Sequence, residues 1–228
     1  MATIQFFSGN SMRGVMNELT AKFEKATGHK LEAGYDPAQI LLERIEKGET
    51  TDVLILNGPT LAKLVKAGKV VPDSVRPLYS NGVGVGVKAG APKPDISTVD
   101  AFKRALLAAK TVSWTTQGAS GIYFAGLIEK LGIAEPLKAK AVCQPGGLVG
   151  ELVVAGKSEL AVQQIPELMS VRGLDLVGPL PKDLQHITAA SGGVFTGSKN
   201  AAAAQAFLDF LTGPDAKQTF KSKGMDPA

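Results

Sequence analysis

Hydrophobic residues along this chain follow two alternating patterns, short continuous runs and longer segments with helical spacing. The run Asp52–Leu56 (Asp-Val-Leu-Ile-Leu) predicts a buried strand, because it is almost wholly apolar and is bounded by turn residues. The first helical segment has one apolar face, made of Met12, Val15, Met16, Leu19, Phe23 and Ala26. Gly28 follows this segment and predicts where the helix ends.

Further segments of both kinds continue to the end of the chain. We expect strands near residues 4–7, 30–34, 82–87, 111–114, 160–163, 174–177 and 186–190. We expect helices near residues 40–45, 60–68, 99–109, 118–131, 148–155, 199–211 and 214–223. Strands that alternate with helices predict an α/β fold with mostly parallel sheets and flanking helices.

The composition is that of an ordinary globular protein. Of the 228 residues, 44% are hydrophobic and 20% are charged, which excludes disordered and fibrous classes. The 25 Lys and Arg residues exceed the 21 Asp and Glu residues, and the net charge of +4 fits a small anionic ligand. The basic residues form no stripe with aromatic residues, so we expect no nucleic-acid partner. No apolar run is long enough to predict membrane insertion.

Several catalytic and metal-binding signatures are missing, so we expect neither a metal nor a cofactor. Cys143 is the only cysteine, which excludes an internal disulfide and a thiolate zinc site. Gly82–Gly86 has the wrong glycine spacing for a dinucleotide loop, and Gly197–Lys199 lacks the upstream glycine of a phosphate loop. Gly118–Gly121 (Gly-Ala-Ser-Gly) differs from the hydrolase pattern Gly-x-Ser-x-Gly.

Two turns have the composition of anion-binding sites. Ser8–Arg13 joins the first predicted strand to the first helix, and Gln117–Gly121 joins a later strand to its helix. Both contain glycine and serine, which let a ligand approach the backbone and add hydroxyl donors. Because helix N-termini carry free N–H groups, we expect ligand contacts at these turns. The simpler alternative is that Ser11 and Ser120 only cap their helices.

Several segments, taken in order, are similar to those of a known family. They are Phe7–Ser11 with Val15–Leu19, Ile45–Gly48 with Asp52–Ile55, Ala119–Tyr123 with Leu131–Gly132, and Gly213–Gly224. On these segments the chain resembles type II periplasmic solute-binding proteins, in the molybdate-binding-like branch that also includes aconitate-isomerase-like proteins. The resemblance implies a two-lobe fold with the ligand in the cleft between the lobes.

The resemblance also implies how the chain divides. Lobe one takes residues 1–81 and 190–228, and lobe two takes residues 82–189. Gly82–Val87 and the stretch near Ile187–Ser191 are expected to cross between the lobes. Such a protein binds a small anion and has an ABC-transporter permease as its partner. We expect it to be periplasmic if a signal peptide was removed and otherwise cytoplasmic, since the sequence shows no signal-peptide pattern.

Relatives that bind tetrahedral oxyanions hold them with hydroxyls and backbone N–H groups, and the resemblance assigns Ser11 and Ser120 to these positions. The chain departs from the family at Asp36–Gln39, where relatives have a serine cluster, and at Gln164, where molybdate binders have a tyrosine. Arg13 is an additional cation that can pair bidentately, so an organic carboxylate is favoured over molybdate. The expected ligand-binding residues are Gly9, Asn10, Ser11, Arg13, Gln39, Ser120, Gly146, Gly147, Gln163 and Gln164.

The same branch offers an alternative function, a cofactor-free isomerase that shifts the double bond of an unsaturated polycarboxylate by proton transfer. Such an enzyme needs a base, for which Tyr35, Asp36 and His186 are candidates. The simpler alternative for Arg13 is an exposed helix residue. For Gln163 and Gln164, one of which is expected to point inward, it is a strand-end amide bonded within the fold. A LysR-type effector domain ranks last, because no helix-turn-helix segment precedes the first strand.

Overall fold

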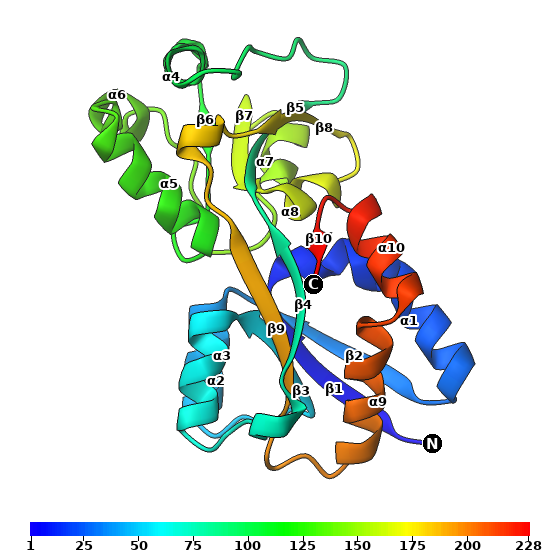
Figure 1. Ribbon diagram of the computed structural model, residues 1–228. Helices are drawn as coiled ribbons and strands as arrows, with labels where there is room; N and C mark the ends of the chain where they lie inside the picture. The colour runs from blue at the N-terminus through cyan, green and yellow to red at the C-terminus, as the bar shows by residue number, and fades with distance from the viewer. The chain divides into compact units, whose positions relative to one another are not determined.

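Each of the two parts of this fold is organised around its own β-sheet (Figure 1). The computed structural model describes residues 1–228. The chain separates into unit 1, formed by Met1–Ser80 with Thr188–Ala228, and unit 2, formed by Asn81–Ile187. Helices flank the sheet of each unit. The predicted α/β class with two sheets and flanking helices is therefore confirmed.

The sheet of unit 1 has the strand order β10-β4-β9-β3-β1-β2. Its strands are β1 (Thr3–Ser8), β2 (Lys30–Tyr35), β3 (Val53–Asn57), β4 (Arg76–Asn81), β9 (Thr188–Val194) and β10 (Asp226–Pro227). Its helices are η1 (Asn10–Met12), α1 (Arg13–Thr27), α2 (Ala38–Glu46), α3 (Gly58–Lys66), η2 (Pro72–Ser74), α9 (Ala201–Leu211) and α10 (Pro214–Ser222). Strands from the end of the chain thus complete a sheet that the first strands begin.

Side chains that alternate along β1 build the core on both faces of this sheet. Phe6 belongs to a buried cluster formed with α1, α9 and α10, where its ring lies 5.2 Å from the ring of Phe207. Phe7 belongs to a second cluster, with Leu41 of α2 and Leu61 of α3. Because successive side chains of a strand point to opposite faces, one strand supplies both layers.

The sheet of unit 2 has the strand order β6-β7-β5-β8. Its strands are β5 (Val83–Lys88), β6 (Val112–Ser113), β7 (Leu160–Gln164) and β8 (Leu174–Pro179). Its helices are α4 (Val99–Ala108), α5 (Ala119–Lys130), α6 (Ala134–Lys138), α7 (Gly150–Val154), α8 (Ile165–Met169) and η3 (Lys182–Leu184). Its main core cluster includes Trp114 and Phe124, whose rings meet edge to face at 5.3 Å.

The sheets are mixed rather than mostly parallel, which corrects the expectation from the sequence. β1 is parallel to β2 and β3, and β6 is parallel to β7. β3 is antiparallel to β9, and β5 is antiparallel to β7 and β8. β5 brings the chain into unit 2 and β8 leads out of it, so these two strands run in opposite directions.

The expected crossing strand Gly82–Val87 is instead part of the sheet of unit 2, because β5 pairs with β7 and β8. The amide of Gln185 forms two hydrogen bonds with the backbone of Val83, the first residue of β5, as a neighbouring strand would. Gln185 Nε2 donates to the carbonyl oxygen of Val83 at 3.0 Å, and the N–H of Val83 donates to Gln185 Oε1 at 2.8 Å. A Cβ at Gly82 would lie 2.9 Å from this amide, so the pairing requires glycine there.

A buried carboxylate joins three segments of unit 1. Asp52 is 7% exposed and accepts hydrogen bonds from the N–H of Gln5 at 2.9 Å and the hydroxyl of Ser198 at 2.5 Å. The amide of Asn200 donates to the same carboxylate at 3.4 Å and to the carbonyl oxygen of Thr3 at 3.1 Å. Asp52 therefore holds β1, the start of β3 and the segment leading to α9 in one place.

Replacing Asp52 with alanine should lower the free energy of unfolding by about 2–3 kcal/mol, because hydrogen bonds to a charged group are lost and buried donors are left unpaired. Urea denaturation followed by far-UV circular dichroism measures this change. The control is Glu46→Ala, since Glu46 is exposed and its loss should cost less than about 0.5 kcal/mol. Equal effects of the two substitutions would contradict the role of Asp52.

Candidate functional site

The carboxyl ends of three parallel strands meet at one edge of the sheet in unit 1. β1 pairs with β2 and β3 in a register that sets Ser8 beside Tyr35 and Ile55. The turn that follows Ser8 leads directly into η1 and α1. Ligands of α/β sheets bind beyond the carboxyl ends of the strands, where helices begin. This edge brings together four of the expected site residues, Gly9, Asn10, Ser11 and Arg13.

Arg13 is held at this edge by an amide and an aromatic ring. Its Nε donates to Oδ1 of Asn10 at 2.9 Å, and its guanidinium carbon lies 4.9 Å from the centre of the Tyr35 ring. The side chain is half-buried, and no Asp or Glu forms an ion pair with it. The terminal Nη groups therefore remain available as two parallel donors, the arrangement that matches a carboxylate.

Ser11 does not cap the first helix, which corrects the simpler alternative drawn from the sequence. Neither η1 nor α1 has a side-chain hydrogen bond at its N-cap, and α1 has no acidic residue in its first turn. Instead, Ser11 Oγ lies 2.8 Å from the phenol oxygen of Tyr79, and both residues are 5% exposed. The first turn of α1 therefore has neither a side-chain cap nor an acidic residue, and this favours an anion there.

Tyr35 is the aromatic member of this group. Its ring packs edge-on against the ring of Phe6 at 5.9 Å, and it also faces the guanidinium of Arg13. Burial raises the pKa of Tyr35 to about 12, while the positive charge of Arg13 opposes that rise. The phenol is therefore protonated at neutral pH. Tyr35 can donate a hydrogen bond there, but it is not the base that an isomerase needs.

The turn before α2 is occupied by an ion-pair network. Nη1 of Arg44 donates to Asp36 at 2.5 Å, and Nη2 donates to Glu49 at 2.6 Å. The guanidinium carbon of Arg44 also lies 4.4 Å from the centre of the Phe7 ring. Asp36, a candidate base, therefore has a structural partner that fixes the end of β2 to the end of α2.

Gln39 is directed along its own helix. It is exposed, and its amide donates to the carboxylate of Glu43 at 3.4 Å, one turn further along α2. Gln39 forms no hydrogen bond with Asn10, Ser11 or Arg13. Of the residues expected to bind the ligand in unit 1, Gln39 is thus the one set apart from the others.

Unit 2 has a comparable edge, where the parallel strands β6 and β7 end. α5 begins after β6 with Gly118 at its N-cap, and Ser120 is buried in its first turn without capping it. A Cβ at Gly121 would collide with the backbone oxygen of Thr115, so glycine is required for the close approach of this helix. The start of α5, like that of α1, has no acidic residue in its first turn.

Gln163 and Gln164 both end β7, but their surroundings differ. Gln163 is 1% exposed, donates to the carbonyl oxygen of Gly147 at 2.7 Å and accepts from the N–H of Val149 at 3.0 Å. Its amide is therefore used to hold the Gly146–Gly147 turn, as the simpler alternative from the sequence has it. Gln164 is half-buried at the N-cap of α8, and its side chain makes no cap hydrogen bond. Since the amide of Gln163 is bonded within the fold, Gln164 is the glutamine whose amide can bind a ligand.

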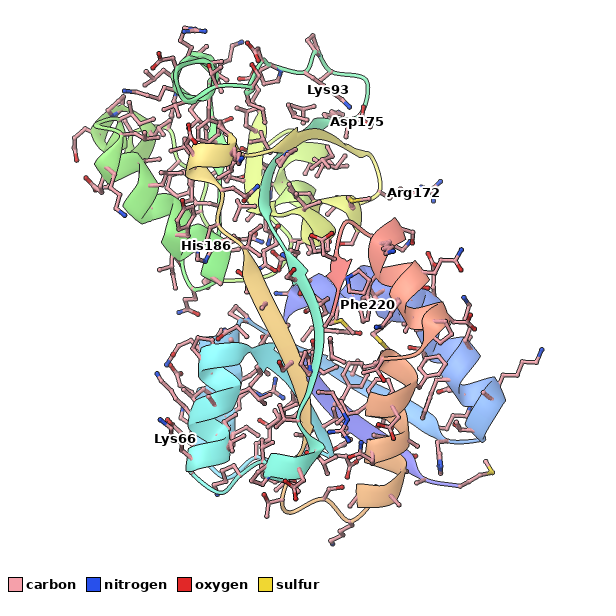
Figure 2. All side chains as sticks on the ribbon, in the orientation of Figure 1. Lys66, Lys93, Arg172, Asp175, His186 and Phe220 are labelled. Atoms are coloured by element: carbon pink, nitrogen blue, oxygen red, sulfur yellow. The ribbon has the colours of Figure 1, made fainter.

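His186 lies on the segment that leads into β9, as Figure 2 shows. Its imidazole is stacked on the ring of Tyr123, with centroids 4.5 Å apart and planes inclined by 15°. The Tyr123 hydroxyl donates to the carbonyl oxygen of Leu184 at 2.9 Å. The imidazole of His186, a candidate base, is thus packed against the ring of Tyr123.

Several polar residues of interest were not predicted from the sequence. Ser8 Oγ, Thr115 Oγ1 and the amide of Asn81 are buried without a hydrogen-bond partner. Ser8 ends β1 and is the first residue of one candidate turn, and Thr115 follows β6, shortly before the other candidate turn at Gln117–Gly121. A polar residue at the end of an apolar strand is the signal that could have found them. Tyr79 was missed because β4 (Arg-Pro-Leu-Tyr-Ser-Asn) contains no apolar run.

Two further observations describe the chain as a whole. No group of three or more His, Cys, Asp and Glu side chains is arranged to hold a metal ion. None of the helices has both the length and the apolar character that crossing a bilayer requires. The candidate donors in both units are hydroxyl, amide, guanidinium and backbone N–H groups.

The sequence pattern of the bacterial extracellular solute-binding protein family matches residues 4–226. The chain belongs to this family. The match includes nearly all of both units, and it confirms the resemblance to solute-binding proteins drawn from the sequence.

The relatives of this chain include both kinds of protein named for the predicted branch. An aconitate isomerase of a Pseudomonas species is 34% identical over 233 residues, which cover 100% of this chain and 88% of that protein. The molybdate-binding protein ModA of Azotobacter vinelandii is 26% identical over 245 residues, covering 98% of this chain and 89% of that protein. The solved structure of the periplasmic molybdate-binding protein of Azotobacter vinelandii has a TM-score of 0.81 at 17% identity and covers 97% of this chain and 98% of that chain. This last likeness confirms the two-lobe fold.

The protein should lose stability between pH 10 and pH 12 through Tyr35. An unfolded tyrosine ionises near its ordinary pKa of 10.0, whereas burial raises the pKa of folded Tyr35 to about 12. The folded state binds more protons in this window, so the free energy of unfolding falls as the pH rises through it. Tyr35→Phe should remove about 1–2 kcal/mol of that fall between about pH 9 and about pH 11.5, measured by urea denaturation. A variant whose stability follows the pH in the same way as the unchanged protein would show that Tyr35 is not responsible.

Proposed function

We propose that this protein binds a small organic carboxylate and that Arg13 is the residue that selects it. The observation that carries the proposal is a half-buried guanidinium without an acidic partner, at the end of β1 and the start of α1. A cation in the first turn of a helix opposes the helix dipole, so this placement is unfavourable for the fold alone. A bound carboxylate supplies the missing charge and accepts two parallel hydrogen bonds.

The residues around Arg13 suit the same ligand. Because Asn10 accepts the Nε–H of Arg13, the guanidinium is left with an edge made of its Nη groups. The turn Gly9–Ser11 adds backbone N–H groups and the hydroxyl of Ser11. Donors of three kinds are therefore gathered at the end of one strand, and an ionised carboxylate accepts from all of them.

Unit 2 offers donors of the same class, and we propose that these also contact the ligand. They are the hydroxyl of Ser120, the amide of Gln164 and the backbone N–H groups of Gly146 and Gly147. An amide side chain both donates and accepts, whereas a fully ionised tetrahedral oxyanion only accepts. The amide of Gln164 therefore fits an organic acid with several functional groups better than it fits molybdate.

The transport role follows from the family, and its details are part of the proposal. Membership of a solute-binding family supports capture of a ligand, and the relative named for molybdate binding supports an anion. We propose that the protein delivers its carboxylate from the periplasm to an ABC-transporter permease. Such a role requires that the ligand be released chemically unchanged.

A second candidate function, isomerisation of an unsaturated polycarboxylate, is favoured by one specific observation. A protein named aconitate isomerase is 34% identical over 100% of this chain. The reaction moves a proton between carbons next to carboxyl groups and needs a positioned base. Tyr35 keeps its proton at neutral pH, and Asp36 and His186 are each engaged by a neighbouring side chain. Binding without turnover is for this reason the first proposal.

The first experiment is a thermal-shift screen of the full chain against molybdate, sulfate and a series of di- and tricarboxylates. A ligand that binds only the folded state raises the melting temperature by mass action. We expect di- or tricarboxylates to raise it. A response to molybdate or sulfate alone would overturn the carboxylate proposal.

Proton NMR in deuterated water then separates the two candidate functions. Each carboxylate that raises the melting temperature is incubated with the protein and its spectrum is followed. A spectrum that does not change supports the binding protein. Deuterium uptake or a moved double bond would make the protein an isomerase instead.

Arg13→Ala should weaken the binding of tricarballylate, a saturated tricarboxylate, by about 10- to 100-fold, because two charge-assisted hydrogen bonds are lost. Isothermal titration calorimetry measures the dissociation constant. The matched control is Arg172→Ala, which removes the same charge from an exposed arginine that points away from the ribbon in Figure 2. If both variants lose affinity equally, net charge accounts for the effect and Arg13 does not contact the ligand.

Gln164→Ala should weaken tricarballylate binding by about 3- to 10-fold and leave the melting temperature of the free protein nearly unchanged. Gln163→Ala should instead lower that melting temperature, because it leaves the N–H of Val149 and the carbonyl oxygen of Gly147 unpaired. Calorimetric titration and thermal unfolding of both variants test the contrast. Unchanged affinity in Gln164→Ala would remove this residue from the proposal.

A further inference from the structure

We propose that Asn81 is a specificity-determining residue whose amide recognises a hydroxyl group beside a carboxylate of the ligand. The inference rests on the proposed function and narrows its ligand class from small organic carboxylates to hydroxylated polycarboxylates. Asn81 is the last residue of β4, and it is not among the residues that the sequence assigned to the ligand.

The amide of Asn81 is buried and has no hydrogen-bond partner in the fold. The residue is 2% exposed, and neither Oδ1 nor Nδ2 forms a hydrogen bond. Most buried polar groups of proteins are paired, and a buried amide that lacks partners is unfavourable for the fold alone. The missing partners are an acceptor for Nδ2 and a donor for Oδ1.

A second buried amide of the same chain shows the contrasting case. Gln163 is also almost fully buried, but its amide donates to the carbonyl oxygen of Gly147 and accepts from the N–H of Val149. The fold therefore supplies both partners to an amide that it uses structurally. Asn81 receives neither, so its amide is available to a ligand.

Asn81 lies two residues along the chain from each group of proposed ligand donors. The hydroxyl oxygen of Tyr79, two residues before Asn81, lies 2.8 Å from Ser11 Oγ in unit 1. Val83, two residues after Asn81, pairs with Gln164 in unit 2. Two residues of extended chain span only about 7 Å. This position supports a contact between the Asn81 amide and a ligand that those donors hold.

The two atoms of the Asn81 amide need partners of opposite kinds. Nδ2 donates and Oδ1 accepts, whereas an ionised carboxylate only accepts. A carboxylate alone would therefore pair Nδ2 and leave Oδ1 unpaired. A hydroxyl on the carbon that carries the carboxylate supplies the missing donor. A site that bonds a hydroxyl in this way rejects the analogue without it, because the analogue leaves a buried acceptor unpaired.

Citrate and tricarballylate form a matched pair of probes, because they differ only in the hydroxyl on the central carbon. Citrate should bind the full chain about 10- to 100-fold more tightly than tricarballylate, measured by isothermal titration calorimetry. Asn81→Leu replaces the amide by an apolar group of similar shape, and the two probes should then bind within about 3-fold of each other. Arg13→Ala is the control, since it should weaken both probes and leave their ratio unchanged.

The melting temperature of the ligand-free protein is a second readout. Asn81→Leu should leave it unchanged or raise it, because an unpaired buried amide is removed. Gln163→Met makes the same kind of replacement at an amide bonded within the fold, and it should lower the melting temperature. If the leucine variant does not fold, Asn81→Ala takes its place in the titrations, since alanine needs no additional room.

The remaining outcomes each contradict the inference. Equal binding of the two probes to the unchanged protein would overturn it and leave the proposed function standing. A preference for citrate that persists in Asn81→Leu would show that another residue recognises the hydroxyl. A fall in melting temperature like that of Gln163→Met would show that Asn81 is bonded within the fold through a buried water. If neither probe binds, the tricarboxylate form of the proposed function fails together with the inference.

Discussion

The candidate site depends on a guanidinium that the fold holds in place without neutralising it. The chain contains an informative comparison, because two arginines of unit 1 lie over aromatic rings. Arg44 lies over Phe7 and is bonded to Asp36 and Glu49, so both charge and packing are satisfied within the protein. Arg13 lies over Tyr35 and donates to the amide of Asn10, and it forms no ion pair with an acidic residue. The first arrangement stabilises a loop, and the second leaves a cation in need of an anion.

The ring of Tyr35 stabilises the guanidinium of Arg13 in the absence of an anionic partner. A cation above a ring is stabilised by roughly 0.5–1 kcal/mol at a partly exposed site, which is less than a charged hydrogen bond gives. The ring fixes the plane of the guanidinium but does not occupy its Nη donors. A ligand therefore meets donors that are already oriented and loses little entropy in ordering them. Because Tyr35 keeps its proton at neutral pH, its ring stays uncharged beneath the guanidinium of Arg13.

Local features of the fold were readable in the sequence, and features made by distant residues were not. The first helix ends at Gly28, as predicted, where the backbone φ is 72°. The family resemblance rested on short local segments, and the family match over residues 4–226 confirms it. The mixed sheets were not predicted, because strand direction depends on how the chain passes between the units. Gln163 and Gln164 are adjacent and identical in type, so only the structure shows that one amide is used within the fold. The bond between Ser11 and Tyr79 has no local pattern at all.

The last residues of the chain have a consequence for any experiment that modifies it. β10 (Asp226–Pro227) pairs with β4 at the edge of the sheet, and the N–H of Ala228 donates to the carbonyl oxygen of Leu78. These residues therefore shield a strand edge that would otherwise be open to pairing with another chain. They also hold the strand that carries Tyr79. Removing residues 226–228 would therefore expose the backbone of β4 and loosen the strand on which the bond between Ser11 and Tyr79 depends.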